Sequence, residues 1–239
     1  MAERFYTSDP LGEGEYVLTG PEAHHLATVR RFTAGDRVTL FNGDGRDYPA
    51  EVVTLGKKSA VLNVFAPTAV ERELPFPLVV ASALPKGDRG DFLIEKLTEL
   101  GVTRFVPLIT TRSVVVPKES VTEKLSRAVI EASKQCGRNR LMVVDPPQKW
   151  EAFLSRTDLP DRRIVLHTGP GVPALTDHGG VVVAVGPEGG FTEEEIAAAL
   201  AKGWIAASLG PRVLRVETAA IAAAVRLSSP AGSTPQVLP

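Results

Sequence analysis

The sequence predicts an α/β protein whose larger part holds a mostly parallel sheet and whose first part is a small β-barrel. From residue 78 onward, strand-length apolar runs alternate with helical patterns, which is typical of parallel α/β sheets. Residues 181–185 are apolar throughout, as expected of a strand buried on both faces. Before residue 67, short strands and tight turns indicate the barrel. We therefore expect two domains, at residues 1–72 and 73–239.

The first domain is expected to contain four strands and one short helix. The strand patterns lie at residues 15–18, 36–42, 48–55 and 59–66. Residues 24–32 predict the helix. Residues 42–47 contain an Asn-Gly and an Asp-Gly pair, so they predict a hairpin between the second and third strands. Residues 68–77, which include two prolines, are expected to form a linker.

The second domain is expected to alternate strands with helices. Strands are predicted at residues 78–84, 103–109, 141–144, 163–168, 181–186 and 205–210. Helices are predicted at residues 91–101, 121–137, 193–203 and 216–229. Capping boxes, in which Ser120 faces Glu123 and Thr192 faces Glu195, mark the start of the second and third of these helices.

One connection in the second domain is unusual. Residues 169–180 join two predicted strands without any helical pattern. A parallel crossover normally includes a helix that covers the sheet. Either the two flanking strands are not simple neighbours, or the chain follows an uncommon path between them.

The composition excludes several classes of protein. The 239 residues carry a net charge of −1, include one cysteine, and lack an apolar stretch long enough to span a membrane. We expect a soluble, cytoplasmic protein. The four histidines do not combine with cysteine or acidic residues at a ligand spacing, so no metal site is expected. Because the net charge is nearly zero, any contact with RNA must come from local patches.

Three predicted loops at strand ends have a similar composition. Residues 166–171, 185–190 and 209–219 each begin at the end of a predicted strand and contain glycine and proline. Ligands of open α/β sheets bind at this edge, and such loops can present main-chain groups to an adenine ring. Both common phosphate-binding motifs are missing, so phosphates are not expected to hold a ligand here. The alternative is that the three segments are tight turns that bind nothing.

Five segments together resemble a known family. They read GPEGGFTEEE, LGPRVLRVETAAIAA, LPKGDRGDFLIEKLTELGV, EASKQCGRNRL and, more loosely, HHLATVRRFTAGDRV. This set resembles the 16S ribosomal RNA uridine-N3 methyltransferase family of the SPOUT superfamily and covers nearly the whole chain. Small departures from the family pattern occur at Glu95, at Leu141-Met142 and at Val216, where a hydroxyl is lost beside the cofactor loop.

The resemblance implies an S-adenosylmethionine-dependent enzyme. Its expected product is N3-methyluridine in 16S rRNA near the decoding centre, formed during maturation of the small ribosomal subunit. It implies a PUA-like barrel that binds RNA at residues 1–72 and a SPOUT methyltransferase domain with a C-terminal trefoil knot at residues 73–239. It also implies a homodimer. The expected contacts with S-adenosylmethionine are Leu166, His167, Thr168, Gly186, Pro187, Glu188, Gly189, Leu209, Gly210, Val213, Leu214 and Arg215.

The chemistry calls for a cation and a carboxylate. N3 of uridine is protonated at neutral pH, and after deprotonation its negative charge spreads onto two carbonyl oxygens, which a guanidinium could stabilise. Arg138, Arg140 and Arg215 are the candidate cations, and Glu188 and Glu217 the candidate carboxylates. We select Arg138, Arg215 and Glu188 as catalytic. Alternatively, Arg138 and Arg140 only bind phosphates. Glu188 would then accept hydrogen bonds from loop amides, and Glu217 would stabilise the N-terminus of its helix. The sequence does not identify the base.

RNA contact is expected from local basic residues. Residues 118–140 hold more basic than acidic residues, whereas residues 1–72 hold more acidic than basic ones. The pair Arg30-Arg31 in the barrel either contacts RNA or only faces solvent. The expected RNA contacts are Arg30, Arg31, Arg112, Lys134, Arg138 and Arg140.

Two rival functions remain at this point. The first is a non-catalytic RNA-binding module on an α/β platform, which would not bind S-adenosylmethionine. The second is an enzyme acting on a nucleotide phosphate, which the missing phosphate loops disfavour. Titration with S-adenosylmethionine and with ATP separates them.

Overall fold

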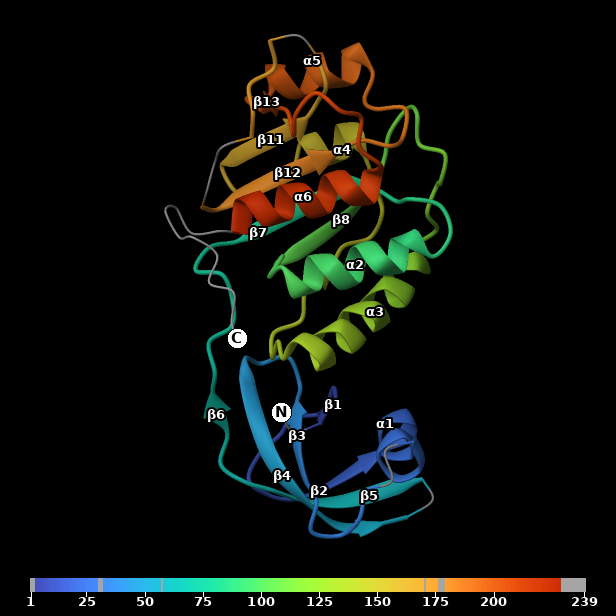
Figure 1. Cartoon of the computed structure of the whole chain (residues 1–239), viewed down its shortest axis with the longest axis vertical. Helices are drawn as coiled ribbons and strands as arrows, with labels where there is room; N and C mark the ends of the chain where they lie inside the picture. Colours follow the sequence, from blue (N-terminus) through green and yellow to red (C-terminus); the bar gives the residue numbers. More distant parts are fainter. Residues whose placement is uncertain (1–2, 30–31, 57, 170, 176–178, 229–239) are drawn as a thin grey trace. The chain divides into compact units, whose positions relative to one another are not determined.

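The computed structural model describes residues 3–29, 32–56, 58–169, 171–175 and 179–228 (Figure 1). The chain divides into two units. Unit 1 combines Met1–Glu73 with Ile130–Leu141, and unit 2 combines Leu74–Val129 with Met142–Pro239. Unit 1 thus includes a segment, 130–141, that lies within the second domain as predicted from the sequence.

Unit 1 is built on a sheet with the strand order β1-β3-β4-β5-β2, and β6 pairs with β4. The four predicted strands are present, and β3 and β4 form the predicted antiparallel hairpin. The sequence did not predict β1, which pairs in parallel with β3, or β6, which lies in the expected linker. The strands are β1 (Arg4–Tyr6), β2 (Gly14–Thr19), β3 (Arg37–Phe41), β4 (Arg46–Leu55), β5 (Ser59–Val64) and β6 (Thr68–Ala69).

The helical segment of unit 1 begins earlier than the sequence predicted. α1 (Gly20–His24) has proline in its first turn, where the missing N–H is harmless, and the π-helix η1 (His25–Val29) continues it. Its buried residues Ala23 and Leu26 pack into the sheet core with Phe5. Arg30 and Arg31 lie outside the described residues.

Unit 2 is built on a parallel sheet, which confirms the predicted fold class. Its order is β10-β8-β7-β12-β11-β13, with β9 paired to β8, and every strand pair is parallel. The central strands β7 and β12 are buried at every position, as their apolar sequences predicted. The strands are β7 (Leu78–Ala83), β8 (Arg104–Ile109), β9 (Val143–Val144), β10 (Gln148–Lys149), β11 (Arg162–Leu166), β12 (Val181–Val185) and β13 (Ile205–Ala207).

Helices pack on the sheet of unit 2. α6 contacts β7, β12 and α2, while α4 packs on β8 and β10, and α5 on β13 (Figure 1). The four predicted helices are present, whereas α4 and β10 had no clear pattern in the sequence. No described helix is long and apolar enough to cross a membrane. The helices are α2 (Arg89–Glu99), α3 (Val121–Cys136), α4 (Trp150–Leu154), α5 (Glu193–Ala201) and α6 (Val216–Ser228).

In the connection between β11 and β12, the described residues 167–169, 171–175 and 179–180 form no helix. The two strands are direct parallel neighbours, so the alternative that they are not adjacent is wrong. The connection passes the end of β13, where Ala174 forms a bridge with Ser208. The Ser208 N–H donates to the Pro173 carbonyl at 2.8 Å, and the Leu175 N–H donates to the Ser208 carbonyl at 2.9 Å. The connection therefore lies beside a third strand before the chain enters β12.

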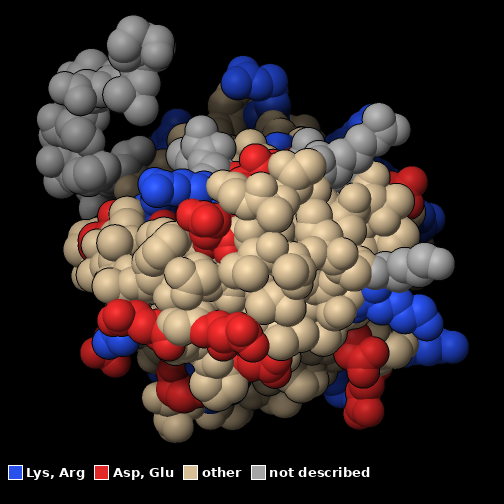
Figure 2. Space-filling model, turned by 90° about the horizontal axis from the view of Figure 1, so that it is seen from below, with Lys and Arg blue, Asp and Glu red and all other residues tan. Residues whose placement is uncertain are grey.

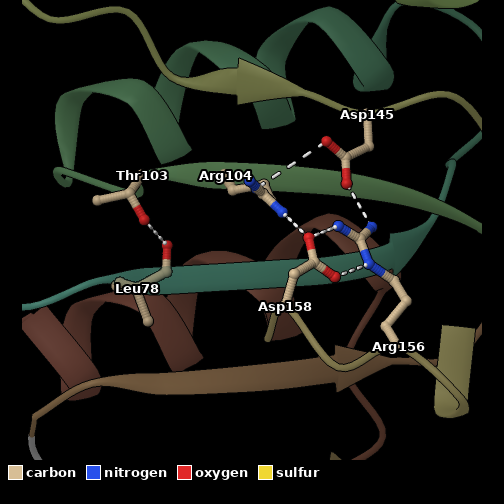
Figure 3. A network of polar contacts seen from close by, with 6 residues as sticks. All are labelled: Leu78, Thr103, Arg104, Asp145, Arg156 and Asp158. Atoms are coloured by element: carbon tan, nitrogen blue, oxygen red, sulfur yellow. Dashed lines mark hydrogen bonds and ion pairs between the residues drawn. The ribbon is translucent and has the colours of Figure 1, made fainter. Parts of the chain in front are cut away.

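A network of charged side chains lies where β8 begins (Figure 3). Arg104 at the start of β8 reaches Asp158 at 2.6 Å, and Arg156 binds both Asp158 and Asp145. The hydrogen bonds from Arg156 and Arg104 hold the pKa of Asp158 well below its usual range. These charges lie at the amino end of β8, whereas ligands bind at the carboxyl ends of strands.

Candidate functional site

A cavity of about 260 Å³ lies where β11 and β12 end. Loops that follow β11, β12 and β13 form its walls, so the three strand-end segments singled out from the sequence converge. All of the predicted cofactor residues except Arg215 line it. Five further residues, which were not among the predicted cofactor contacts, also line the cavity: Val185, Gly190, Phe191, Arg212 and Ala219.

The loop after β12 needs glycine because it folds back on itself. A Cβ atom at Gly186 would lie 3.0 Å from Phe191 Cδ2 and 3.1 Å from the Phe191 nitrogen, which is tighter than most Cβ contacts in proteins, so Phe191 would have to move by a few tenths of an ångström. Gly190 has a φ of +68°, and its N–H donates to the Pro187 carbonyl at 2.8 Å. The Gly-Pro-Glu-Gly-Gly sequence thus specifies a tight turn whose backbone borders the cavity.

The loop after β13 also depends on a glycine. Gly210 has a φ of +116°, and its N–H donates to Ser208 Oγ at 3.1 Å. The loop then leads into α6, whose Ala219 N–H donates to the Arg215 carbonyl at 2.8 Å. Within this loop Val213 is 83% exposed, an unusual position for an apolar side chain at a cavity wall.

The predicted capping box at Thr192 is confirmed and has a second role. Thr192 Oγ1 accepts from the Glu195 N–H, and Glu195 Oε2 accepts from the Thr192 N–H at 2.8 Å. Glu195 is buried, and its other oxygen, Oε1, accepts from the Thr111 N–H at 2.8 Å. The same carboxylate therefore joins the start of α5 to the loop after β8.

Arg112, which the sequence suggested as an RNA contact, binds the loop after β12. Its Nη1 donates to the Gly189 carbonyl at 2.8 Å and lies 3.5 Å from the Phe191 carbonyl. The side chain packs on Gly189, where a Cβ atom would lie 3.3 Å from Arg112 Cδ. A pattern of local charge could not reveal this contact, because Arg112 and Gly189 lie 77 residues apart.

The two candidate carboxylates have different environments. Glu188 lines the cavity and is exposed. Glu217, in the first turn of α6, is buried and pairs with Arg89 Nη1 at 3.3 Å. In the described part of the chain, Glu217 Oε2 has no hydrogen-bond partner. Arg215 is exposed but does not line the cavity.

Arg138 lies buried within unit 1. The sequence suggested Arg138 as an RNA contact, but a guanidinium that is buried in this way does not face solvent. Its Nε and Nη2 donate to Glu73 Oε1 and Oε2 at 3.0 and 2.5 Å, and its carbonyl accepts from Arg4 Nη2 at 3.2 Å. The residue is 4% exposed. The ion pair with Glu73 explains how a charged side chain is buried here.

Lys134 and Arg140, two basic residues near Arg138 in the sequence, differ in how far their side chains are exposed to solvent. Lys134 Nζ binds Glu22 at 2.8 Å and Glu131 at 3.2 Å, and little of its side chain is exposed. Burial lowers the pKa of Lys134, but the bonds with Glu22 and Glu131 outweigh it and raise that pKa above its usual value. Arg140, in contrast, is exposed. Its guanidinium lies against Gly45 of the β3–β4 hairpin, where a Cβ atom would lie 2.7 Å from Arg140 Cζ.

Charge is mixed on the face shown in Figure 2. Uncharged residues fill its centre, acidic side chains gather along one margin, and basic ones lie at several points around it. Among the residues coloured there, Lys and Arg do not form one continuous area. Nor do the described residues contain a group of three or more His, Cys, Asp or Glu that could hold a metal ion.

Two family models match the chain. Residues 72–228 match an RNA methyltransferase domain, and residues 18–65 match an RNA methyltransferase PUA domain. Ribosomal RNA small subunit methyltransferase E of Synechocystis is 33% identical, over 96% of this chain and 78% of that protein. The Bacillus subtilis protein of the same name is 31% identical, over 89% of each chain.

Solved structures agree with these matches. Ribosomal RNA small subunit methyltransferase E from Neisseria gonorrhoeae, bound to S-adenosylmethionine, has a TM-score of 0.86 and 30% identity and covers 94% of this chain and 96% of its own. A protein from Legionella pneumophila in complex with the same cofactor has a TM-score of 0.86 and 32% identity, with the same coverage. The similarity thus extends over both units.

Proposed function

Because this chain belongs to the ribosomal RNA small subunit methyltransferase E family, with its RNA methyltransferase and PUA domains, we propose that it methylates N3 of a uridine in 16S rRNA. The methyl donor is S-adenosylmethionine, and the uridine lies near the decoding centre. The observation that carries the proposal is the cavity at the ends of β11 and β12, which is lined by the loops that the sequence assigned to this cofactor.

The lining of the cavity fits S-adenosylmethionine. Apolar side chains such as Leu166, Leu209 and Leu214 can pack on an adenine ring, and the glycine-rich loops bring main-chain groups to the wall. A side chain at Gly186 would press on Phe191, and glycine there keeps the wall close to the backbone. Tight packing of this kind excludes water and fixes the orientation of what is bound.

The chain's own groups must handle the proton and the charge of the uridine. When bound, the cofactor supplies an activated methyl group on its sulfonium sulfur. N3 must lose its proton, and the resulting charge spreads onto the flanking carbonyl oxygens. Arg215, exposed beside the cavity residue Leu214, is our candidate for stabilising that charge. Glu188, exposed at the cavity wall, is our candidate acceptor of the proton.

Contact with RNA is proposed for Arg140, Arg30 and Arg31. Arg140 is supported by its exposure beside the β3–β4 hairpin, and Arg30 and Arg31 by the sequence alone. For Arg138 the buried ion pair with Glu73, and for Lys134 the largely covered ion pair with Glu22, favour a positioning role over direct contact with phosphates. A homodimer and a trefoil knot in unit 2, which rest on the family resemblance, and a cytoplasmic location, which rests on the composition, complete the proposal.

The test is a methyl-transfer assay on two substrates, naked 16S rRNA and isolated small ribosomal subunits. Labelled S-adenosylmethionine is added, the RNA is digested to nucleosides, and mass spectrometry locates the methyl group. N3-methyluridine at one site is the expected product. RNA binding without cofactor binding would instead establish a non-catalytic RNA-binding module, and methylation of another atom would refute the proposed specificity.

A further inference from the structure

The loop that follows β8 contacts loop 186–191, which follows β12, from outside the cavity. Two adjacent residues of this loop, Thr111 and Arg112, make the contacts. The Thr111 N–H donates to the buried carboxylate of Glu195, and the adjacent side chain of Arg112 binds the carbonyls of Gly189 and Phe191. Backbone and side chain of one short segment thus hold both the start of α5 and the turn that precedes it.

The contact with Arg112 involves residues that border the cavity. Gly189 and Phe191 both line it, and their carbonyls accept from Arg112 Nη1 at 2.8 and 3.5 Å. The aliphatic part of the arginine also packs on Gly189, as the short distances from a Cβ atom there to Arg112 Cβ and Cδ indicate. Within the turn, the Gly190 N–H binds the Pro187 carbonyl. The arginine therefore fixes a turn with two glycines, whose backbone is otherwise highly adaptable.

We propose that Arg112 is a positioning residue for the S-adenosylmethionine site and that its main role is not to bind RNA phosphate. Its charge-assisted hydrogen bonds hold loop 186–191 in the conformation that lines the cavity, and Glu195 anchors the backbone next to it. Without the guanidinium, part of the binding free energy must be used to order the loop, so affinity falls. The ligand named here rests on the proposed function.

An arginine suits this role better than a lysine. Its planar guanidinium presents several donors at fixed angles, so one nitrogen can lie near two carbonyls while the stem packs on the loop. A lysine at this position would keep the positive charge but lose the fixed geometry. The two substitutions therefore separate charge from positioning.

The experiment measures the S-adenosylmethionine affinity of the full chain by calorimetry in the absence of RNA. We compare the wild type with Arg112→Ala, Arg112→Lys and a control, Arg127→Ala, which removes an exposed arginine of α3. Arg112→Ala should weaken binding by about tenfold, as the loss of a hydrogen bond from a charged group does, and Arg112→Lys by a smaller factor. The control should bind as the wild type does.

A second readout separates positioning from RNA contact. In the methyl-transfer assay, Arg112→Ala should raise the KM for S-adenosylmethionine and leave kcat at saturation nearly unchanged. The salt dependence of RNA binding should also stay unchanged. Normal cofactor affinity together with a flatter salt dependence would overturn the inference and restore the RNA role. If the wild type itself bound no S-adenosylmethionine, the proposed function would fail instead.

Discussion

Arg138 and Glu73 form a two-pronged ion pair inside unit 1. The guanidinium Nε and Nη2 lie 3.0 and 2.5 Å from the two carboxylate oxygens, and the side chains are 5% and 11% exposed. The pair joins the segment after α3 to the segment after β6, next to the Arg4 contact with the Arg138 carbonyl. An arginine suggested by the sequence as a catalytic or RNA-binding group thus has a structural partner.

Removal of Arg138 should destabilise unit 1. Arg138→Ala leaves the carboxylate of Glu73 buried without its partner, and such a loss destabilises by about 3 kcal/mol. Urea denaturation followed by circular dichroism measures the change. The matched control is Arg140→Ala, which removes an exposed arginine two residues away and should change stability by less than about 0.5 kcal/mol. Equal stability of the two variants would contradict a structural role for Arg138.

Arg140 should act on RNA binding alone. Because its guanidinium is exposed, Arg140→Ala should weaken binding of a 16S rRNA fragment and reduce the salt dependence by about one counterion. Fluorescence anisotropy at several salt concentrations gives the slope. Affinity for S-adenosylmethionine should not change. An unaltered slope would remove Arg140 from the RNA-contacting set.

A methyl group at Gly186 should damage the cofactor cavity. In Gly186→Ala the new Cβ atom would lie 3.0 Å from Phe191, so the loop must shift, and we expect S-adenosylmethionine affinity to fall by about tenfold or more. Gly12→Ala is the control, because a Cβ atom there meets open space. A side chain at Gly189 would press on Arg112, so Gly189→Val should act through that arginine. Calorimetry showing wild-type affinity for Gly186→Ala would refute this account of the loop.

Tryptophan fluorescence should report cofactor binding. Both tryptophans of the chain, Trp150 and Trp204, lie in one aromatic cluster. The ring centroids of Trp150 and Phe191 are 4.5 Å apart, and Phe191 lines the cavity. Addition of S-adenosylmethionine should therefore change the emission with the same midpoint that calorimetry gives. Phe191→Leu should reduce the amplitude. An emission spectrum that does not respond at saturating cofactor would show that the cluster is insulated from the cavity.

The Lys134 ion pair should stabilise the fold in a pH-dependent way. The pKa of Lys134 is raised, so its contribution is fully present below the usual lysine value of 10.5 and is lost as the pH rises through the higher folded-state value. Lys134→Gln should therefore be less stable than the wild type at pH 8, and the difference should shrink above pH 10.5. Denaturation at both pH values measures it, with Glu22→Gln as the reciprocal variant. A difference that does not depend on pH would contradict this.

Local signals in the sequence were sufficient for the fold class and for the cavity. The apolar run of β12 predicted a strand buried on both faces, since the lack of alternation leaves no face for water. The Thr192–Glu195 capping box predicted the start of α5, because the residues that make it are three apart. The carboxyl ends of parallel strands meet at one edge, so three glycine-rich loops could be assigned to a common pocket.

Only the tertiary structure decided what each charged residue does. Arg138 pairs with a carboxylate 65 residues away, Lys134 with one 112 residues away, and Arg112 with a carbonyl 77 residues away. A charged side chain carries no local mark of its partner, because its pattern in the sequence is the same whether it meets water, a phosphate or a buried carboxylate. The packing of distant segments determines which of these it meets, and so distinguishes the exposed Arg140 from the buried Arg138.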